Sequence, residues 1–196
     1  MACTAQLMGL GQLASDTNLV FKRKYRWTFA LESPCGPAIP PHFVKLASRP
    51  NLTIEETEIN FLHGKMYLPG KGTWESITVT YYDVGNGGAG MSGLYSWLAT
   101  VYNFTNPACL SQASKIGQGQ NSGGYAGIGT LKLYDGCGTV MEKWTLKQVW
   151  PQAINFGELD YSSSEEVTIE LTLRYAEVKL ELFCGGSITV CCGGCS

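Results

Sequence analysis

Alternation of apolar and polar residues is the strongest pattern in this chain. It is clearest between 165 and 175, where Val167, Ile169, Leu171, Leu173 and Tyr175 alternate with Glu166, Thr168, Glu170, Thr172 and Arg174. A period of two places these sets on opposite faces of a β-strand, with the apolar face buried. The segment 19–31 has the same period, and Lys22, Lys24 and Arg26 lie on its polar face. We therefore expect a strand over each of these segments.

Further segments carry strand signals of the same kind. They are 77–81, 131–133, 141–147 and 149–159, the last with Trp150, Ile154 and Phe156 expected on one face. One helix is predicted over 92–103, where apolar residues recur at helical spacing. The segment 109–129, rich in Gly, Ser, Gln and Asn, is predicted to be a long exposed loop. The fold class is therefore mainly β, a sandwich or small barrel with one helix.

The charged residues are few, and this shortage is a first indication that the chain is a subunit of a larger assembly. The 196 residues carry 14 basic and 16 acidic side chains, a net charge of −2, which argues against a protein that binds nucleic acid by neutralising its phosphates. Only 15% of residues are charged, against roughly 25% in an ordinary soluble domain. The acids cluster in 51–60 and 158–170. These clusters are either solvated faces of a monomer or an acidic surface past which DNA slides without sticking.

Candidate chemistry is confined to the cysteines. No HExxH, GxSxG or P-loop pattern occurs, so we expect no enzymatic activity, cofactor or metal. The eight cysteines leave disulfides, free thiols and a zinc site open as alternatives, and zinc would need four ligands. The candidates for disulfide bonds are Cys3, Cys184, Cys191, Cys192 and Cys195. The apolar runs are far shorter than the roughly 18 residues of a membrane span, so no membrane contact is expected.

Several segments, in order, resemble the tube proteins of contractile phage tails. They are NLVFKRKYRWTF (18–29), FVKLASRP (43–50), IEETEINFLHGK (54–65), PGKGTW (69–74), ITVTYYD (77–83), WTL (144–146), WPQAINFG (150–157), LDY (159–161) and VTIELTLRY (167–175). The resemblance covers about 18–175 except for the Gly-rich loop. It departs at both ends, and we divide the chain into an N-terminal extension (1–17), a tube domain (18–183) and a Cys/Gly-rich tail (184–196).

The resemblance implies both a fold and a function. Members of the family have two packed antiparallel β-sheets with a flanking helix, and six subunits close a 24-stranded barrel around a lumen. Stacked rings form a tube inside a contractile sheath, and the tube conducts double-stranded DNA into the host. The implied partners are further copies of the chain, the sheath, baseplate and terminator proteins, the tape measure protein, and DNA in transit without sequence-specific binding. The implied location is the virion tail, assembled in the bacterial cytoplasm.

Three sets of residues are expected to serve this assembly. The strands 52–60, 149–159 and 165–175 are candidates for the inner barrel, with Glu166, Thr168, Glu170, Thr172, Arg174 and Asn155 lining the lumen. The segment 51–71 is expected to be a hairpin or long loop that reaches the next ring, and it carries Glu55, Glu56, Glu58, His63 and Lys65. The facing of 52–60 stays open. The basic residues Lys22, Lys24 and Arg26 are expected to face the sheath.

Two other functions stay open. The tubes of type VI secretion and of contractile injection systems look like the same fold, so the chain could serve a device that carries protein effectors. A carbohydrate-binding β-sandwich is the alternative from a different class. It would require exposed aromatic side chains among Trp74, Trp97, Trp144 and Trp150.

Overall fold

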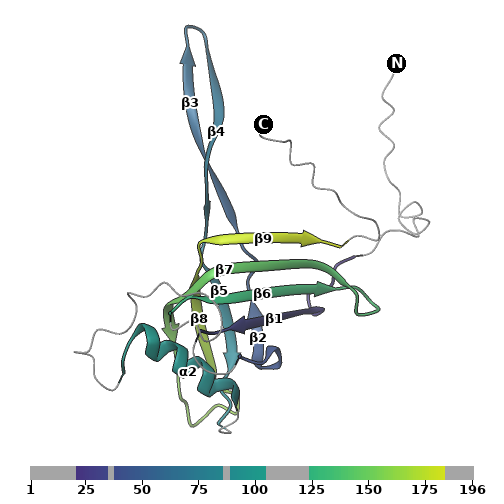
Figure 1. Ribbon diagram of the computed structural model, residues 1–196, viewed down its shortest axis with the longest axis vertical. Coiled ribbons are helices and arrows are strands. Elements are labelled where there is room, and N and C mark those ends of the chain that lie inside the picture. Colours follow the sequence, from purple (N-terminus) through teal and green to yellow (C-terminus); the bar gives the residue numbers. More distant parts are fainter. Residues whose placement is uncertain (1–20, 35–37, 86–88, 105–123, 184–196) are drawn as a thin grey trace.

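The computed structural model describes residues 21–34, 38–85, 89–104 and 124–183, and the described part is mainly β-structure with one α-helix (Figure 1). The elements are β1 (Trp27–Glu32), η1 (Pro41–Phe43), β2 (Val44–Ala47), β3 (Leu52–Phe61), β4 (Gly64–Trp74), β5 (Ile77–Tyr82), α2 (Ala89–Val101), β6 (Gly127–Tyr134), β7 (Val140–Asn155), β8 (Thr168–Arg174) and β9 (Glu177–Leu182). The prediction of a mainly β fold with antiparallel sheets and one helix is confirmed.

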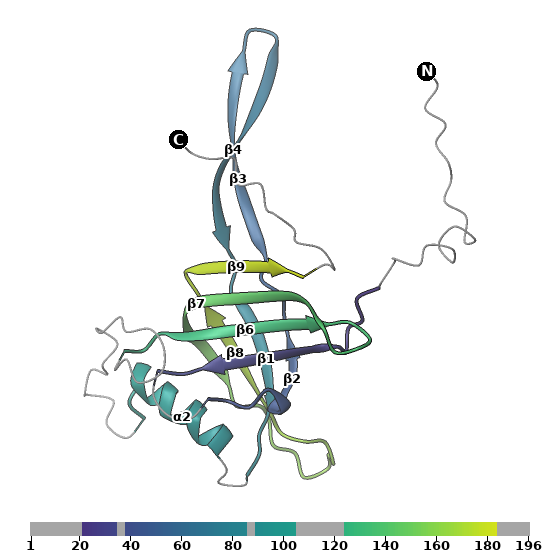
Figure 2. The same ribbon diagram turned by 45° about the vertical axis from the view of Figure 1, so that its right-hand side comes forward.

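Two antiparallel sheets share the long strand β7. Sheet A has the order β1-β6-β7-β9, and sheet B has the order β7-β8-β5-β2 (Figure 2). The first part of β7 pairs with β6 and β9, and its last part, from Trp150, pairs with β8. Gln148 lies two residues before this change of partner, with φ 54°, a left-handed backbone that is uncommon outside glycine. The change of sheet is therefore made at a local kink in a single strand.

The core lies between the two sheets and is closed at one end by α2. Phe29 and Leu146 come from sheet A, Val79 and Leu171 from sheet B, and Trp97 from the helix; all five are buried. The Trp97 indole Nε1 donates a hydrogen bond to the Tyr125 carbonyl at 2.7 Å, which ties α2 to the segment before β6. The strong alternation in the sequence between 168 and 175 is confirmed, because Ile169, Leu171, Leu173 and Tyr175 are all buried.

Three predicted boundaries were wrong. The strand expected over 19–31 begins only at Trp27, since residues 21–26 form coil and a turn. The segments 141–147 and 149–159 are one strand, which ends at Asn155. Of the loop expected over 109–129, residues 109–123 lie outside the described residues, and the last three positions, from Gly127, belong to β6. A side chain at Gly127 would place its Cβ 2.7 Å from the Glu32 carbonyl oxygen, so this glycine serves close strand packing rather than loop flexibility.

The expected facing of Trp150 and Phe156 was also wrong. A bulge at Gln152 inserts one residue into β7, so that Pro151 pairs with Leu173 and Ala153 with Thr172. Trp150 consequently lies on the outer face of sheet B opposite Arg174, and Ile154 points inward opposite Leu171. Phe156 lies beyond the end of β7 and stacks on Tyr95 of α2, with ring centroids 6.3 Å apart.

The strands β3 and β4 form a hairpin that projects from the body along the longest axis of the molecule (Figure 1). Its pairing runs from Leu52 opposite Trp74 to Phe61 opposite Gly64, with an irregularity between Ile54 and Glu56. All ten residues of β3 are exposed. This confirms a hairpin over 51–71. Among the described residues, no helix combines the length and apolar character needed to cross a membrane.

Candidate functional site

The outer face of sheet B is mainly polar, with Leu46 and Trp150 as apolar exceptions, and four strands contribute to it. Thr168, Glu170 and Thr172 of β8 lie there because the residues between them are buried in the core. Across the ladder, Thr80 of β5 is opposite Glu170, and Asn155 of β7 is opposite the same residue on the other side. Five of the six residues expected to line the lumen therefore share one face. These five are Asn155, Thr168, Glu170, Thr172 and Arg174.

Glu166 is the exception, because it precedes β8 and lies exposed in the β7–β8 connection. The acids of this region gather in the same connection, which carries Glu158, Asp160, Glu165 and Glu166. On the sheet face itself, Glu170 is balanced by Arg174 of β8. Lys45 of β2 lies over the ring of Tyr82, with its Nζ 5.4 Å from the ring centroid. The face is thus closer to neutral than the acidic run 158–170 indicated.

The hairpin holds all five residues expected for an inter-ring arm. Glu58 and Lys65 form an ion pair at 2.7 Å, and both lie on the same face of the hairpin as Tyr67. The opposite face carries Ile59 and Met66, which pair with one another across the ladder. In the distal part, Glu56 and Glu58 lie on the face opposite Ile59. Both faces of β3 are exposed, so the facing that the sequence left open stays open. His63 lies in the turn between the two strands.

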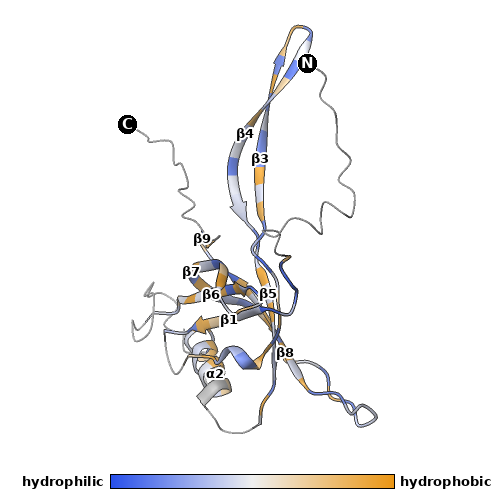
Figure 3. Cartoon of the chain, turned by 90° about the vertical axis from the view of Figure 1, so that its right-hand side faces the viewer, coloured by the Kyte–Doolittle hydropathy of each residue, from blue (hydrophilic) through white to orange (hydrophobic). Residues whose placement is uncertain are grey.

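The distal hairpin also presents a large apolar surface. Leu62 at the turn is 97% exposed and Phe61 beside it is 63% exposed. Ile59, Met66 and Tyr67 are exposed as well. Figure 3 shows this mixture of apolar and polar positions along the projecting ribbon. Exposed apolar surface of this extent is typical of a segment that another molecule covers.

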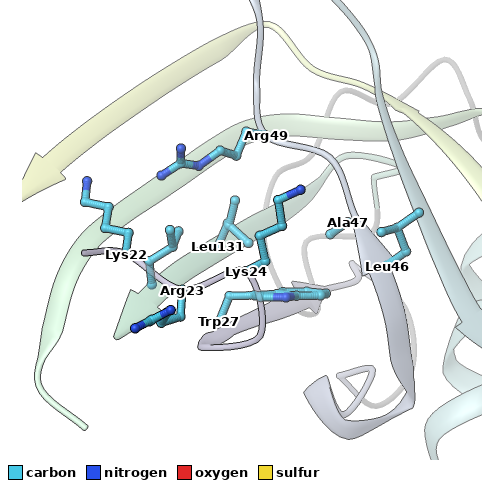
Figure 4. A pocket seen from close by; sticks show the side chains of 9 residues that line it. Lys22, Arg23, Lys24, Trp27, Leu46, Ala47, Arg49 and Leu131 are labelled. Carbon is cyan, nitrogen blue, oxygen red and sulfur yellow. The ribbon is translucent and has the colours of Figure 1, made fainter. Parts of the chain in front are cut away.

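A cleft of about 350 Å³ opens beside the foot of the hairpin, between sheet A and β2 (Figure 4). We call it the basic cleft. Its apolar lining consists of Trp27, Leu46, Ala47, Leu131 and Leu133. Its basic lining consists of Lys22, Arg23, Lys24 and Arg49. Because 21–26 is coil and a turn, alternation does not place Lys22, Lys24 and Arg26 on one face. Lys22 and Lys24 line the basic cleft, and Arg26 does not.

A buried carboxylate holds two of these cations. Glu142 of β7 is only 3% exposed, and Arg49 Nη2 donates to both of its oxygens at 2.7 and 2.8 Å. Lys22 Nζ and the Trp144 indole donate to the same carboxylate. Burial would raise the pKa of Glu142, but the hydrogen bonds from Lys22 and Trp144 and the charge of Arg49 outweigh it and hold that pKa below its ordinary value. The carboxylate thus stays charged and anchors the chain on both sides of the cleft.

Sequence reasoning missed this cluster, although one signal was present. Glu142 occupies the same parity as Leu146 in β7, which is an inward position. An acid at a buried position requires cationic or hydrogen-bonding partners from elsewhere in the chain. Pattern alone could not supply those partners, because Lys22 and Arg49 are 120 and 93 residues away in sequence.

The candidate cysteines Cys3, Cys184, Cys191, Cys192 and Cys195 lie outside the described residues. Cys137 is described, and it is exposed and free. Within the described ranges, no group of three or more His, Cys, Asp or Glu residues could hold a metal ion. The four tryptophans named for a carbohydrate site are not exposed: Trp97 is buried, and Trp74, Trp144 and Trp150 are half-buried.

Comparison with known proteins places this fold. No protein-family model and no curated protein matches the chain. Solved structures do match. The anti-feeding prophage (AFP) baseplate matches at a TM-score of 0.61 with 14% identity, over 83% of this chain and 97% of that chain. The AFP tube-terminating cap matches at a TM-score of 0.61 with 17% identity, over 93% of this chain and 100% of that chain.

A third match comes from an extracellular contractile injection system, PVC, in its sheath/tube terminator. Its TM-score is 0.59 with 18% identity, over 81% of this chain and 95% of that chain. At these identities the likeness concerns the fold. The chain has the tube fold of contractile tails and injection systems, as its resemblance in sequence implied.

Proposed function

We propose that this protein is the structural subunit of the tube in a phage contractile tail, and that it has no enzymatic activity. Six copies form a ring, and rings stack into a tube inside a contractile sheath. The observation that carries the proposal is the four-stranded sheet B. Its outer face is mainly polar, and among the described residues each of its two edge strands has one side without a partner strand. The shared fold with tube-terminator and cap components supports it.

Ring closure would use the two edges of sheet B. Among the residues that the structure describes, β2 pairs with β5 alone, and residues 150–155 of β7 pair with β8 alone. Unpaired strand edges expose backbone donors and acceptors that favour pairing with another chain. Joining β2 of one copy to β7 of the next closes a barrel of twenty-four strands, four from each of six copies. The polar face would then line the lumen with Glu170, Thr172 and their neighbours, and the apolar core would stay inside each subunit.

Stacking of rings would use the hairpin. Ten residues in β3 extend roughly 33 Å at the rise of a β-strand, which is long enough to pass the body of a neighbouring copy. Leu62, Phe61 and Met66 would become buried there, and each fully buried large apolar side chain contributes about 1.5–3 kcal/mol. The two strands of the hairpin pair with each other, but their apolar side chains stay exposed until a second ring covers them.

The cargo we propose is double-stranded DNA. The sheet B face has Glu170 against Arg174 and Lys45, so it offers no strong excess of positive charge to hold phosphates. The sheath, baseplate, terminator and tape measure proteins are the partners of this role, and the virion tail, assembled in the bacterial cytoplasm, is its location. A second candidate is the tube of an injection device that carries protein effectors. It is favoured by the matches to the AFP and PVC assemblies.

Two experiments separate these possibilities. Electron microscopy of the overexpressed chain tests the tube itself, since hollow tubes support the proposal and stable monomers contradict it. Particles purified from the native source are then treated with nuclease, opened and analysed. Protected DNA supports the phage tail, and protein effectors in a DNA-free lumen support the injection device.

A further inference from the structure

The connection between β7 and β8 combines acidic charge with exposed apolar side chains. We call residues 157–167 the acidic loop, which carries Glu158, Asp160, Glu165 and Glu166 and no basic residue. Between the acids, Leu159 is 85% exposed and Tyr161 is fully exposed. Exposed apolar side chains among charges are typical of a contact surface rather than of a solvated turn.

The acidic loop is also locally ordered. Asp160 accepts hydrogen bonds from the Ser162 backbone N–H at 2.9 Å and from its hydroxyl at 2.7 Å. Gly157 adopts φ 79°, and a Cβ there would lie 2.6 Å from the Thr168 carbonyl oxygen, which fixes where the loop leaves the sheet. Leu159 and Tyr161 are therefore held outward by a defined turn.

The basic cleft has the opposite character. Trp27, Leu46 and Leu133 offer an apolar surface about the size of one or two side chains, and four cations surround it. Lys22 and Arg49 are paired with Glu142. Arg23 and Lys24 are exposed and form no ion pair with another described residue. The cleft thus matches a segment that presents apolar side chains between carboxylates.

The two surfaces lie at different ends of the body. The acidic loop projects at the end opposite the hairpin (Figures 1 and 3), whereas the cleft is at the foot of the hairpin, since Arg49 lies three residues before β3. In a head-to-tail assembly, complementary patches on different parts of the surface meet between successive copies. We propose that the acidic loop of one copy docks into the basic cleft of a neighbouring copy, with Leu159 and Tyr161 as apolar anchors.

This inference rests on the proposed function, because it needs assembled copies. It also assigns Lys24 to a contact between copies, whereas the sequence pattern assigned this residue to the sheath. The acidic loop is chosen as the segment that fills the cleft because its charge is complementary. The cleft has a basic and apolar lining, the loop is acidic and apolar, and no residue of the loop lines the cleft of its own copy.

The test reverses charge on each side and then on both. Arg23→Glu with Lys24→Glu changes the cleft and spares Lys22 and Arg49, which pair with the buried Glu142. Glu158→Lys with Glu165→Lys changes the loop. Each pair is expected to raise the protein concentration needed for tube formation by about tenfold or more, because like charges would then face each other across the contact. Leu159→Ser with Tyr161→Ser, both exposed, is expected to do the same.

The decisive variant carries both charge reversals, and it is expected to form tubes again near the wild-type concentration. Glu32→Lys reverses an exposed acid outside both surfaces and shows what added positive charge alone does, as the control for the loop reversal. Circular dichroism confirms that each variant is folded. Tubes that form normally with the cleft or loop reversed overturn the inference and leave the tube function standing. Failure of the double reversal to restore assembly also overturns it, whereas failure of the wild type to form any tube overturns the proposed function itself.

Discussion

Glu142 offers the sharpest test of how the folded subunit is held together. The change is Glu142→Gln, which keeps the shape and removes the charge that Lys22, Arg49 and Trp144 bind. Breaking a buried ion pair costs about 3–5 kcal/mol when the remaining charge stays buried. Lys22 and Arg49 are roughly half-exposed and can turn to water, so we expect a smaller loss of about 2–3 kcal/mol.

Thermal unfolding of the dilute, unassembled chain measures this loss. For a domain of this size, each kcal/mol lowers the melting temperature by about 2–4 °C, so a decrease of about 4–12 °C is expected. The matched control is Glu177→Gln, an exposed acid that pairs with Lys147 at 3.0 Å on the edge of the same sheet. An exposed pair contributes about 1 kcal/mol or less, so the control should shift the melting temperature little.

The pH dependence gives the same test a second readout. The pKa of Glu142 is lowered in the folded state, so its contribution is present above the unfolded value of about 4.3 and is lost as the pH falls through the folded pKa. The difference between wild type and Glu142→Gln should therefore be full at neutral pH and shrink in acid below about pH 4. Equal melting temperatures at neutral pH, or a difference that persists unchanged in acid, would refute the reasoning.

Three further predictions follow from the same structure. Gly127→Val should prevent β6 from approaching β1, because its Cβ would meet the Glu32 carbonyl at 2.7 Å; a large loss of stability in urea unfolding is expected, and unchanged stability would show that the strands separate at no cost. Phe61→Ser with Leu62→Ser should leave the melting temperature of the monomer unchanged but yield single rings instead of tubes in electron micrographs, and long tubes would exclude the hairpin from stacking. Arg26→Glu should weaken sheath assembly on preformed tubes in a co-sedimentation assay while bare tubes persist, and normal sheath binding would reject a sheath contact at this residue.

The sequence was most informative where one strand is buried on one face only. In β8 the alternation identified Ile169, Leu171 and Leu173 as core and Thr168, Glu170 and Thr172 as the opposite face. Such a strand has a single period and both neighbours in place, so pattern and environment agree. The helix was predictable for a related reason, since Leu94 and Leu98 recur at helical spacing and are buried. The hairpin has no buried face, and the segment was expected to be either a hairpin or a long loop.

Other features depended on contacts that a linear pattern does not contain. The bulge at Gln152 reverses the facing of Trp150; the neighbouring Pro151 is compatible with a bulge or a strand edge, but it does not specify which residue is inserted. β9 was not singled out, since Leu180 and Leu182 are only partly covered and the strand lies at a sheet edge. The basic cleft required Lys22 and Arg49, far apart in sequence, to meet at Glu142. Residues 21–26 carry a strand pattern, but no described strand pairs with them, and they form coil and a turn instead.

The central claim is that copies of this chain close a ring through the edges of sheet B and stack into a hollow tube. Cryo-electron microscopy of the purified full chain tests it most directly. The account predicts sixfold rings stacked with their hairpins overlapping, and a lumen lined by Glu170, Thr172 and Arg174. Monodisperse monomers at high concentration, or rings in which sheet B faces outward, would contradict it.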